Sequence, residues 1–125
     1  MPIPLLHSVM SWFLKKRVHQ IELFLKYPNE VQGELLTKLI DQAKNTWFGQ
    51  QHGFSSITSY KQFANQVPIS TYEDLAELID RTRKGEQNLF WPSNIKWFAK
   101  SSGTTNAKSK FIPVSKEALN ECHFK

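Results

Sequence analysis

The sequence contains a single cysteine, Cys122, among its 125 residues. One cysteine cannot form an intramolecular disulfide or a zinc site built from several thiolates. The histidines do not pair with one another or with Cys122 at helical i,i+3 or i,i+4 spacing, which argues against a metal site. We therefore expect a reducing compartment and a cytoplasmic protein. The four histidines are His7, His19, His52 and His123.

Long apolar runs are also missing. The uncharged N-terminal stretch ends at Leu14, short of the roughly 18 to 20 residues that a membrane-spanning helix needs. The cations at 15–17 follow this stretch, whereas a secretory signal peptide places its charges before the apolar run. We expect neither a membrane span nor export. We interpret 12–17 as part of a packing helix with a basic outer face rather than as a membrane anchor.

Acidic residues are scarce in one part of the chain. Residues 81–116 carry eight Lys or Arg and only one acid, Glu86, giving a local charge of +7. Residues 1–80 have a net charge of −1, and the whole chain has +5. Because the positive charge is concentrated in one segment, an anionic ligand should bind there.

Helical spacing of apolar residues dominates the chain up to residue 85. Pro28 is expected to end the first helix and Asn29 to cap the second. Thr71 and Asp74 have the spacing of a capping box, and Gly85 is placed to end that helix in a left-handed conformation. The expected helices are 4–27, 29–47, 59–64 and 71–84, and 49–59 is expected to be a loop.

Aromatic and β-branched residues, which favour strands, follow Gly85. We predict strands at 95–99 and 110–114, with Pro113 restricting the second strand to an edge or an end. Ser115 would cap a final helix. The predicted fold class is therefore α/β, with a mostly helical segment 1–85 and a strand–loop–strand–helix segment 86–125 that carries a short β-hairpin.

The loop between the two predicted strands has the composition of a phosphate-binding loop. Residues 100–110 contain five hydroxyl side chains, Gly103 and three lysines. Backbone amides near a glycine, hydroxyl donors and a lysine together suit a polyphosphate, although a solvated hairpin loop has a similar composition. A Walker loop is excluded, because only three residues and Ala107 separate Gly103 from Lys108, and a strand follows where that motif needs a helix.

The order of residues in this loop is more specific than its composition. Ser101-Ser102-Gly103-Thr104-Thr105, four residues, Lys110 and then Ile112-Pro113 resemble the phosphate-binding loop of acyl-adenylate-forming enzymes. The closest resemblance is to the auxin-responsive-promoter family, whose plant members are acyl-acid amido synthetases. It extends over roughly residues 40–115. The other matching pieces are Asn45-Thr46, Phe48-Gly49, His52-Gly53, Val67-Pro68-Ile69, Tyr72-Glu73-Asp74-Leu75 and Arg83-Lys84-Gly85-Glu86.

The resemblance implies an enzyme that activates a small carboxylic acid with ATP, with Mg²⁺ expected, and passes the acyl group to an amine or a thiol. It implies that this chain is the N-terminal part of a larger adenylate-forming domain, a fragment unable to complete turnover alone. Lys110 would be the catalytic loop lysine. Ala107 departs from the glycine usual in the family. The implied phosphate-binding residues are Ser101, Ser102, Gly103, Thr104, Thr105 and Lys110.

Two other functions compete with this interpretation. The chain could be a small nucleic-acid-binding module that uses Arg81, Arg83, Lys84 and the loop lysines, with Trp91 and Trp97 as stacking platforms. It could also be a non-catalytic helical interaction domain. We favour the enzyme, without nucleic acid or membrane as a partner, because the phosphate loop already explains the basic cluster.

Overall fold

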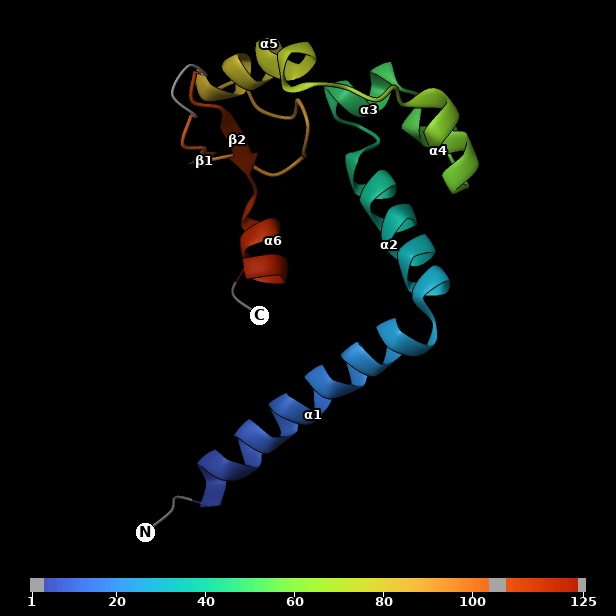
Figure 1. Cartoon of the computed structure of the whole chain (residues 1–125), viewed down its shortest axis with the longest axis vertical. Coiled ribbons are helices and arrows are strands. Elements are labelled where there is room, and N and C mark those ends of the chain that lie inside the picture. Colours follow the sequence, from blue (N-terminus) through green and yellow to red (C-terminus); the bar gives the residue numbers. More distant parts are fainter. Residues whose placement is uncertain (1–3, 104–107, 124–125) are drawn as a thin grey trace. The chain divides into compact units, whose positions relative to one another are not determined.

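The computed structural model describes residues 4–103 and 108–123, and it divides into two compact units, Met1–Leu36 and Thr37–Lys125 (Figure 1). The described part is mostly helical with one antiparallel two-stranded hairpin, as the sequence predicts. The elements are α1 (Pro4–Lys26), α2 (Pro28–Ala43), α3 (Trp47–Gln51), the 3₁₀ helix η1 (Phe54–Ser56), α4 (Tyr60–Gln66), α5 (Tyr72–Arg83), β1 (Trp97–Lys100), β2 (Phe111–Val114), α6 (Lys116–Ala118) and the short π-helix η2 (Leu119–His123).

The first unit contains α1 and the beginning of α2. Helix α1 ends before Pro28 as expected, but α2 begins at Pro28 and is not capped by Asn29. The Val31 N–H donates to the Tyr27 carbonyl at 3.1 Å. Proline is tolerated at a first helical position because its missing N–H has no partner there anyway. None of the helices in the described residues has both the length and the apolar character needed to cross a membrane.

The second unit has a small core formed by residues from α2, η1, α5 and the segment after α5. Helix α2 ends at Ala43, four residues before the predicted end, because Thr46 caps a new helix. The predicted 49–59 loop is therefore wrong in part: it contains most of α3 and all of η1. The buried apolar residues are Ile40, Ala43, Phe54, Ile57, Leu78, Ile79 and Leu89.

Helix α5 is the element that supports the hairpin. Its predicted capping box is confirmed, since Asp74 accepts the Thr71 N–H at 2.7 Å and the Thr71 hydroxyl accepts the Asp74 N–H at 3.4 Å. Gly85 ends the helix region with a φ of 103°, the left-handed conformation expected of it. The chain then returns to α3, where Asn88 and Leu89 carbonyls accept backbone N–H groups of α3 at 2.9 Å.

The hairpin lies beside α5, which contacts β2 (Figure 1). Strand β1 begins two residues later than predicted, and β2 begins one residue later. In the register, Trp97 pairs with Val114 and Lys100 pairs with Phe111. Ser115 caps α6 as predicted, accepting the Ala118 N–H at 3.0 Å.

Candidate functional site

The loop between β1 and β2 is closed by two of the predicted site residues. The Ser101 N–H donates to the Lys110 carbonyl at 2.9 Å, and the Lys110 N–H donates to Ser101 Oγ at 3.1 Å. Ser101 and Lys110 therefore face each other at the base of the loop. This pairing fixes the distance between the first serine of the loop and its lysine.

Ser102 and Gly103 continue from the base of the loop and are exposed. Thr104 and Thr105, also predicted to bind phosphate, lie outside the described residues, as does Ala107. The structure thus brings together Ser101 and Lys110 and places Ser102 and Gly103 next to them. The contribution of the two threonines stays a prediction.

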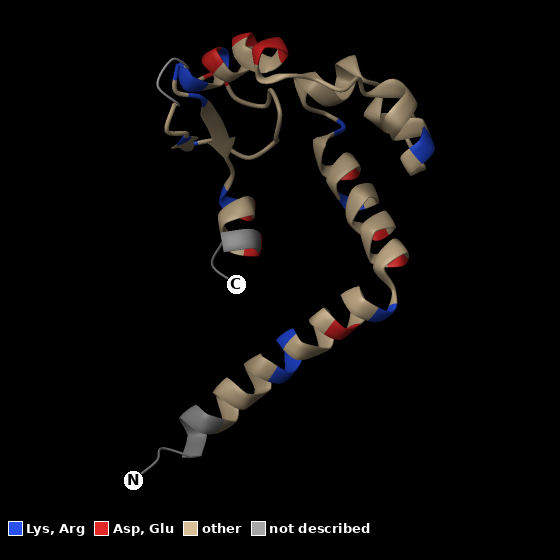
Figure 2. Ribbon diagram, in the orientation of Figure 1, with Lys and Arg blue, Asp and Glu red and all other residues tan. Residues whose placement is uncertain are grey.

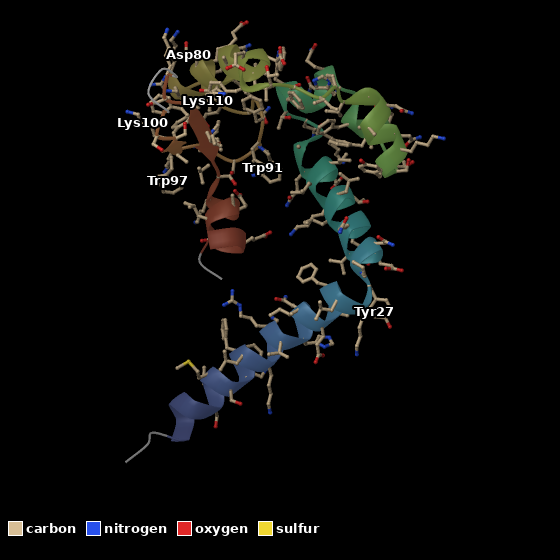
Figure 3. All side chains as sticks on the ribbon, viewed as in Figure 1. Tyr27, Asp80, Trp91, Trp97, Lys100 and Lys110 are labelled. Atoms are coloured by element: carbon tan, nitrogen blue, oxygen red, sulfur yellow. The ribbon has the colours of Figure 1, made fainter. Side chains whose placement is uncertain are left out.

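The side chain of Lys110 extends toward the first turn of α5, and Figure 3 shows it beside this helix at the loop end of the hairpin. Its Nζ lies 3.6 Å from Glu73 Oε1 and 5.1 Å from the centroid of the Tyr72 ring. The Tyr72 hydroxyl oxygen accepts the N–H of Phe111 at 3.0 Å. Two residues of α5 therefore contact the loop lysine and the residue after it.

Sequence reasoning did not place Tyr72 and Glu73 at the loop. They lie next to Thr71 and Asp74 of the capping box, and they belong to a stretch that resembles the family. Neither signal connects them with Lys110, which is 37 residues away from Glu73 in sequence. Only the packing of α5 on β2 makes this connection.

Acidic residues of α5 and the following turn pair with part of the basic segment, and Figure 2 shows acids along α5 near the basic hairpin. The pairs are Lys110 with Glu73, Lys84 with Asp80 at 2.7 Å, and Arg81 with Glu86 at 2.6 Å. These pairs are largely exposed, so each contributes little to stability. Glu73 and Asp80, the two acids of these pairs that lie outside the +7 segment, therefore balance part of its charge.

Hydrogen-bond donors and cations lower the pKa values of two carboxylates in these pairs. The pKa of Glu73 lies below its ordinary value because a backbone N–H hydrogen bond, and next the charge of Lys110, stabilise the ionised form. The pKa of Glu86 is lowered first by its hydrogen bond from Arg81. Glu73 is therefore ionised at neutral pH, and it faces Lys110 as an anion.

Two further cations surround the aromatic ring at the start of β2. The Arg83 guanidinium carbon lies 3.9 Å from the centroid of the Phe111 ring, and Lys100 Nζ lies 5.8 Å from it. Cations over a ring face are attracted by its quadrupole. The base of the loop therefore gathers three cationic side chains, Lys100, Lys110 and Arg83, around Phe111 and Tyr72.

A separate hollow of about 350 Å³ lies between α3 and α5. Its lining includes Phe48, His52, Leu78 and Arg81. None of the described loop residues, 101–103 and 108–110, lines it, and it lies apart from the paired Ser101 and Lys110. The hydroxyl, amide and lysine groups at the hairpin, rather than this hollow, are the groups suited to an anion.

A hairpin loop that presents hydroxyl groups and glycine opposite a lysine defines a candidate anion-binding module. Residues 17–125 match the model of the GH3 family N-terminal domain. The chain belongs to this family, which confirms the resemblance to acyl-acid amido synthetases noted from the loop.

Relatives with similar sequences carry the names of acid–amino acid ligases. The chain is 31% identical to jasmonoyl--L-amino acid synthetase JAR4 and 32% identical to JAR6, both of Nicotiana attenuata. These matches cover 82% and 84% of this chain and 18% of each relative. It is 30% identical to indole-3-acetic acid-amido synthetase GH3.2 of Arabidopsis thaliana, over 84% of this chain and 19% of the relative. The chain thus spans about a fifth of the length of these relatives.

Proposed function

We propose that this chain carries the ATP phosphate-binding loop of an acyl-acid amido synthetase. The observation that carries the proposal is the pairing of Ser101 with Lys110 across the base of a Ser-Ser-Gly-Thr-Thr loop. This pairing keeps the backbone of Lys110 beside the first serine of the loop, at one end of the hairpin. In the proposed site, the loop from Ser101 to Thr105 donates to the terminal phosphates, and Lys110 neutralises their charge.

The proposed reaction has two steps. A carboxylate oxygen of the substrate attacks the α-phosphorus of ATP, the bond to the bridging oxygen breaks, and pyrophosphate leaves with that electron pair. An amine then attacks the acyl carbon, loses a proton and releases AMP. Negative charge grows on the departing pyrophosphate, so fixed donors and a cation at the loop favour the first step. The carboxylate is already ionised at neutral pH and needs no general base.

The comparisons support a role in the step that all of these ligases share. Relatives named for two different acids, jasmonate and indole-3-acetate, match this segment with nearly the same identity. The segment therefore suits the use of ATP, which does not depend on the acid. The amino acids in the relatives' names favour an amine over a thiol as the acceptor. In the proposed reaction, Mg²⁺ would accompany the nucleotide and help to neutralise its phosphates.

Phosphate binding can be tested by NMR titration of the ¹⁵N-labelled chain with inorganic tripolyphosphate, ATP and AMP. We expect tripolyphosphate and ATP to shift the amide signals of Ser101, Ser102, Gly103 and Lys110, and AMP to have a much smaller effect. Lys110→Ala should weaken binding about 10- to 100-fold, as the loss of one charge-assisted contact predicts. Lys108→Ala removes the same charge from an exposed position in the same loop and serves as the matched control.

Equal losses in Lys108→Ala and Lys110→Ala would contradict the proposed role of the loop lysine, because any cation would then serve. A nucleic-acid-binding module would instead bind oligonucleotides with an affinity that falls steeply with salt. Of its two predicted stacking residues, Trp91 is part-buried and its indole N–H donates to Glu117 at 3.3 Å, whereas Trp97 is 47% exposed. For the full-length protein, the proposal expects acid-dependent exchange of pyrophosphate into ATP, abolished by Lys110→Ala.

A further inference from the structure

The N–H of Phe111 needs an acceptor outside the hairpin. Ser101 and Lys110 form a hydrogen-bonded pair, so the next pair, Lys100 with Phe111, is non-hydrogen-bonded in the antiparallel ladder. At such a position the N–H points away from the partner strand. The Tyr72 hydroxyl oxygen accepts it at 3.0 Å. Tyr72 therefore anchors the first residue of β2, directly after the loop lysine.

The same tyrosine supports the lysine itself. Lys110 Nζ lies 5.1 Å from the centroid of the Tyr72 ring, within the range of a cation–π contact. The capping box fixes the position of Tyr72 in the helix. Thr71 is the N-cap of α5, and Tyr72 follows it as the first helical residue. The first turn of α5 thus contacts both the side chain of the loop lysine and the backbone N–H of the next residue, Phe111.

Glu73, the next residue, supplies a counter-ion. Its Oε1 lies 3.6 Å from Lys110 Nζ, and the two side chains are 73% and 46% exposed. An ion pair at this exposure is weak. A polyphosphate, which offers several negative charges at once, can therefore displace the carboxylate from the lysine.

We infer that the first turn of α5 positions the loop lysine, with Tyr72 as the positioning residue and Glu73 as a counter-ion that a bound polyphosphate displaces. The inference rests on the proposed function and deepens it. Tyr72 determines the position of the Lys110 ammonium group, and Glu73 forms the ion pair that a polyphosphate must break when it binds. Neither residue is assigned a contact with the nucleotide.

Three variants separate these roles in the full 125-residue chain. Tyr72→Phe keeps the ring and removes the hydroxyl oxygen, and Tyr72→Leu removes both. Glu73→Gln removes only the charge. As the control, Glu77→Gln makes the same charge change one turn later on α5, where Glu77 lines the hollow beside Arg81.

Affinity for inorganic tripolyphosphate and the NMR signal of the Lys110 εCH₂ group are the two measurements. We expect binding to weaken about 3-fold in Tyr72→Phe and about 10-fold in Tyr72→Leu, and to tighten about 2- to 3-fold in Glu73→Gln, whereas Glu77→Gln stays close to the wild type. The ring should shift the εCH₂ signal upfield in the wild type and in Tyr72→Phe but not in Tyr72→Leu. Tripolyphosphate should move this signal in the wild type.

An εCH₂ signal that is the same in Tyr72→Leu and in the wild type would overturn the positioning role. Unchanged or weaker binding in Glu73→Gln would overturn the counter-ion role. If tripolyphosphate does not bind the wild-type chain at all, the proposed function fails, and the εCH₂ signal of the ligand-free variants still decides the positioning of Lys110 by Tyr72.

Discussion

Replacing Gly49 with alanine should destabilise the second unit, although alanine is the better helix former by about 1 kcal/mol. Gly49 is buried inside α3, and its N–H donates to Thr46 Oγ1 at 3.0 Å. A Cβ at this position would overlap the carbonyl oxygen of Ala43 and lie 3.0 Å from its carbon and 3.1 Å from the Lys44 carbonyl carbon. These neighbours are backbone atoms, so no side chain can turn aside to make room.

The loss of unfolding free energy in Gly49→Ala follows from the displacement of α3. Relieving the overlap shifts α3 away from Ala43, at about 1–3 kcal/mol for overpacking. The shift also stretches the hydrogen bonds between α3 and the Asn88–Leu89 segment, each worth about 1 kcal/mol. After subtracting the gain in helix propensity, the net loss is about 2–3 kcal/mol, which lowers the melting temperature of a unit of this size by roughly 10–15 °C.

Thermal melting and urea unfolding, followed by circular dichroism, would measure this loss. Gly33→Ala is the matched control: Gly33 lies inside α2, and a Cβ there meets nothing within 4 Å. The control should leave stability unchanged or raise it by up to about 1 kcal/mol. A Gly49→Ala variant that melts at or above the wild-type temperature would refute the steric argument.

Two further predictions concern caps of the second unit. Thr46→Val should lower the free energy of unfolding in urea by about 1–3 kcal/mol. The substitution removes a fully buried hydroxyl, which donates to the Ala43 carbonyl at 2.7 Å and caps α3. The exposed Thr58→Val should change stability by less than about 0.5 kcal/mol, and equal effects of the two would contradict the role of burial. The pKa of Asp74 is lowered, first by the backbone N–H of Thr71 and then by its hydroxyl, so the stabilisation is present above the ordinary pKa of 3.8 and is lost as pH falls through the lower folded value. Asp74→Asn should therefore show a smaller loss of unfolding free energy on acidification than the wild type, and parallel pH curves would argue against the capping carboxylate.

Most of the helices, the hairpin and the family follow from the amino-acid sequence. Local signals were sufficient where the physical cause is local: a cap with its N3 partner at 71–74, a left-handed glycine at 85, and strand formers on both sides of a polar loop. The order of residues in that loop was enough to indicate the family. The second helix was predicted too long because its apolar spacing continues to Trp47, beyond the real end at Ala43.

The end of the second helix and the surroundings of the loop lysine depend instead on tertiary packing. Thr46 ends the helical run because its buried hydroxyl caps α3, an arrangement supported by hydrogen bonds to Asn88 and Leu89, more than 40 residues away. Tyr72 reaches the N–H of Phe111 across 39 residues of sequence. Such contacts produce no pattern of spacing in the amino-acid sequence, because they depend on which helix packs on which strand.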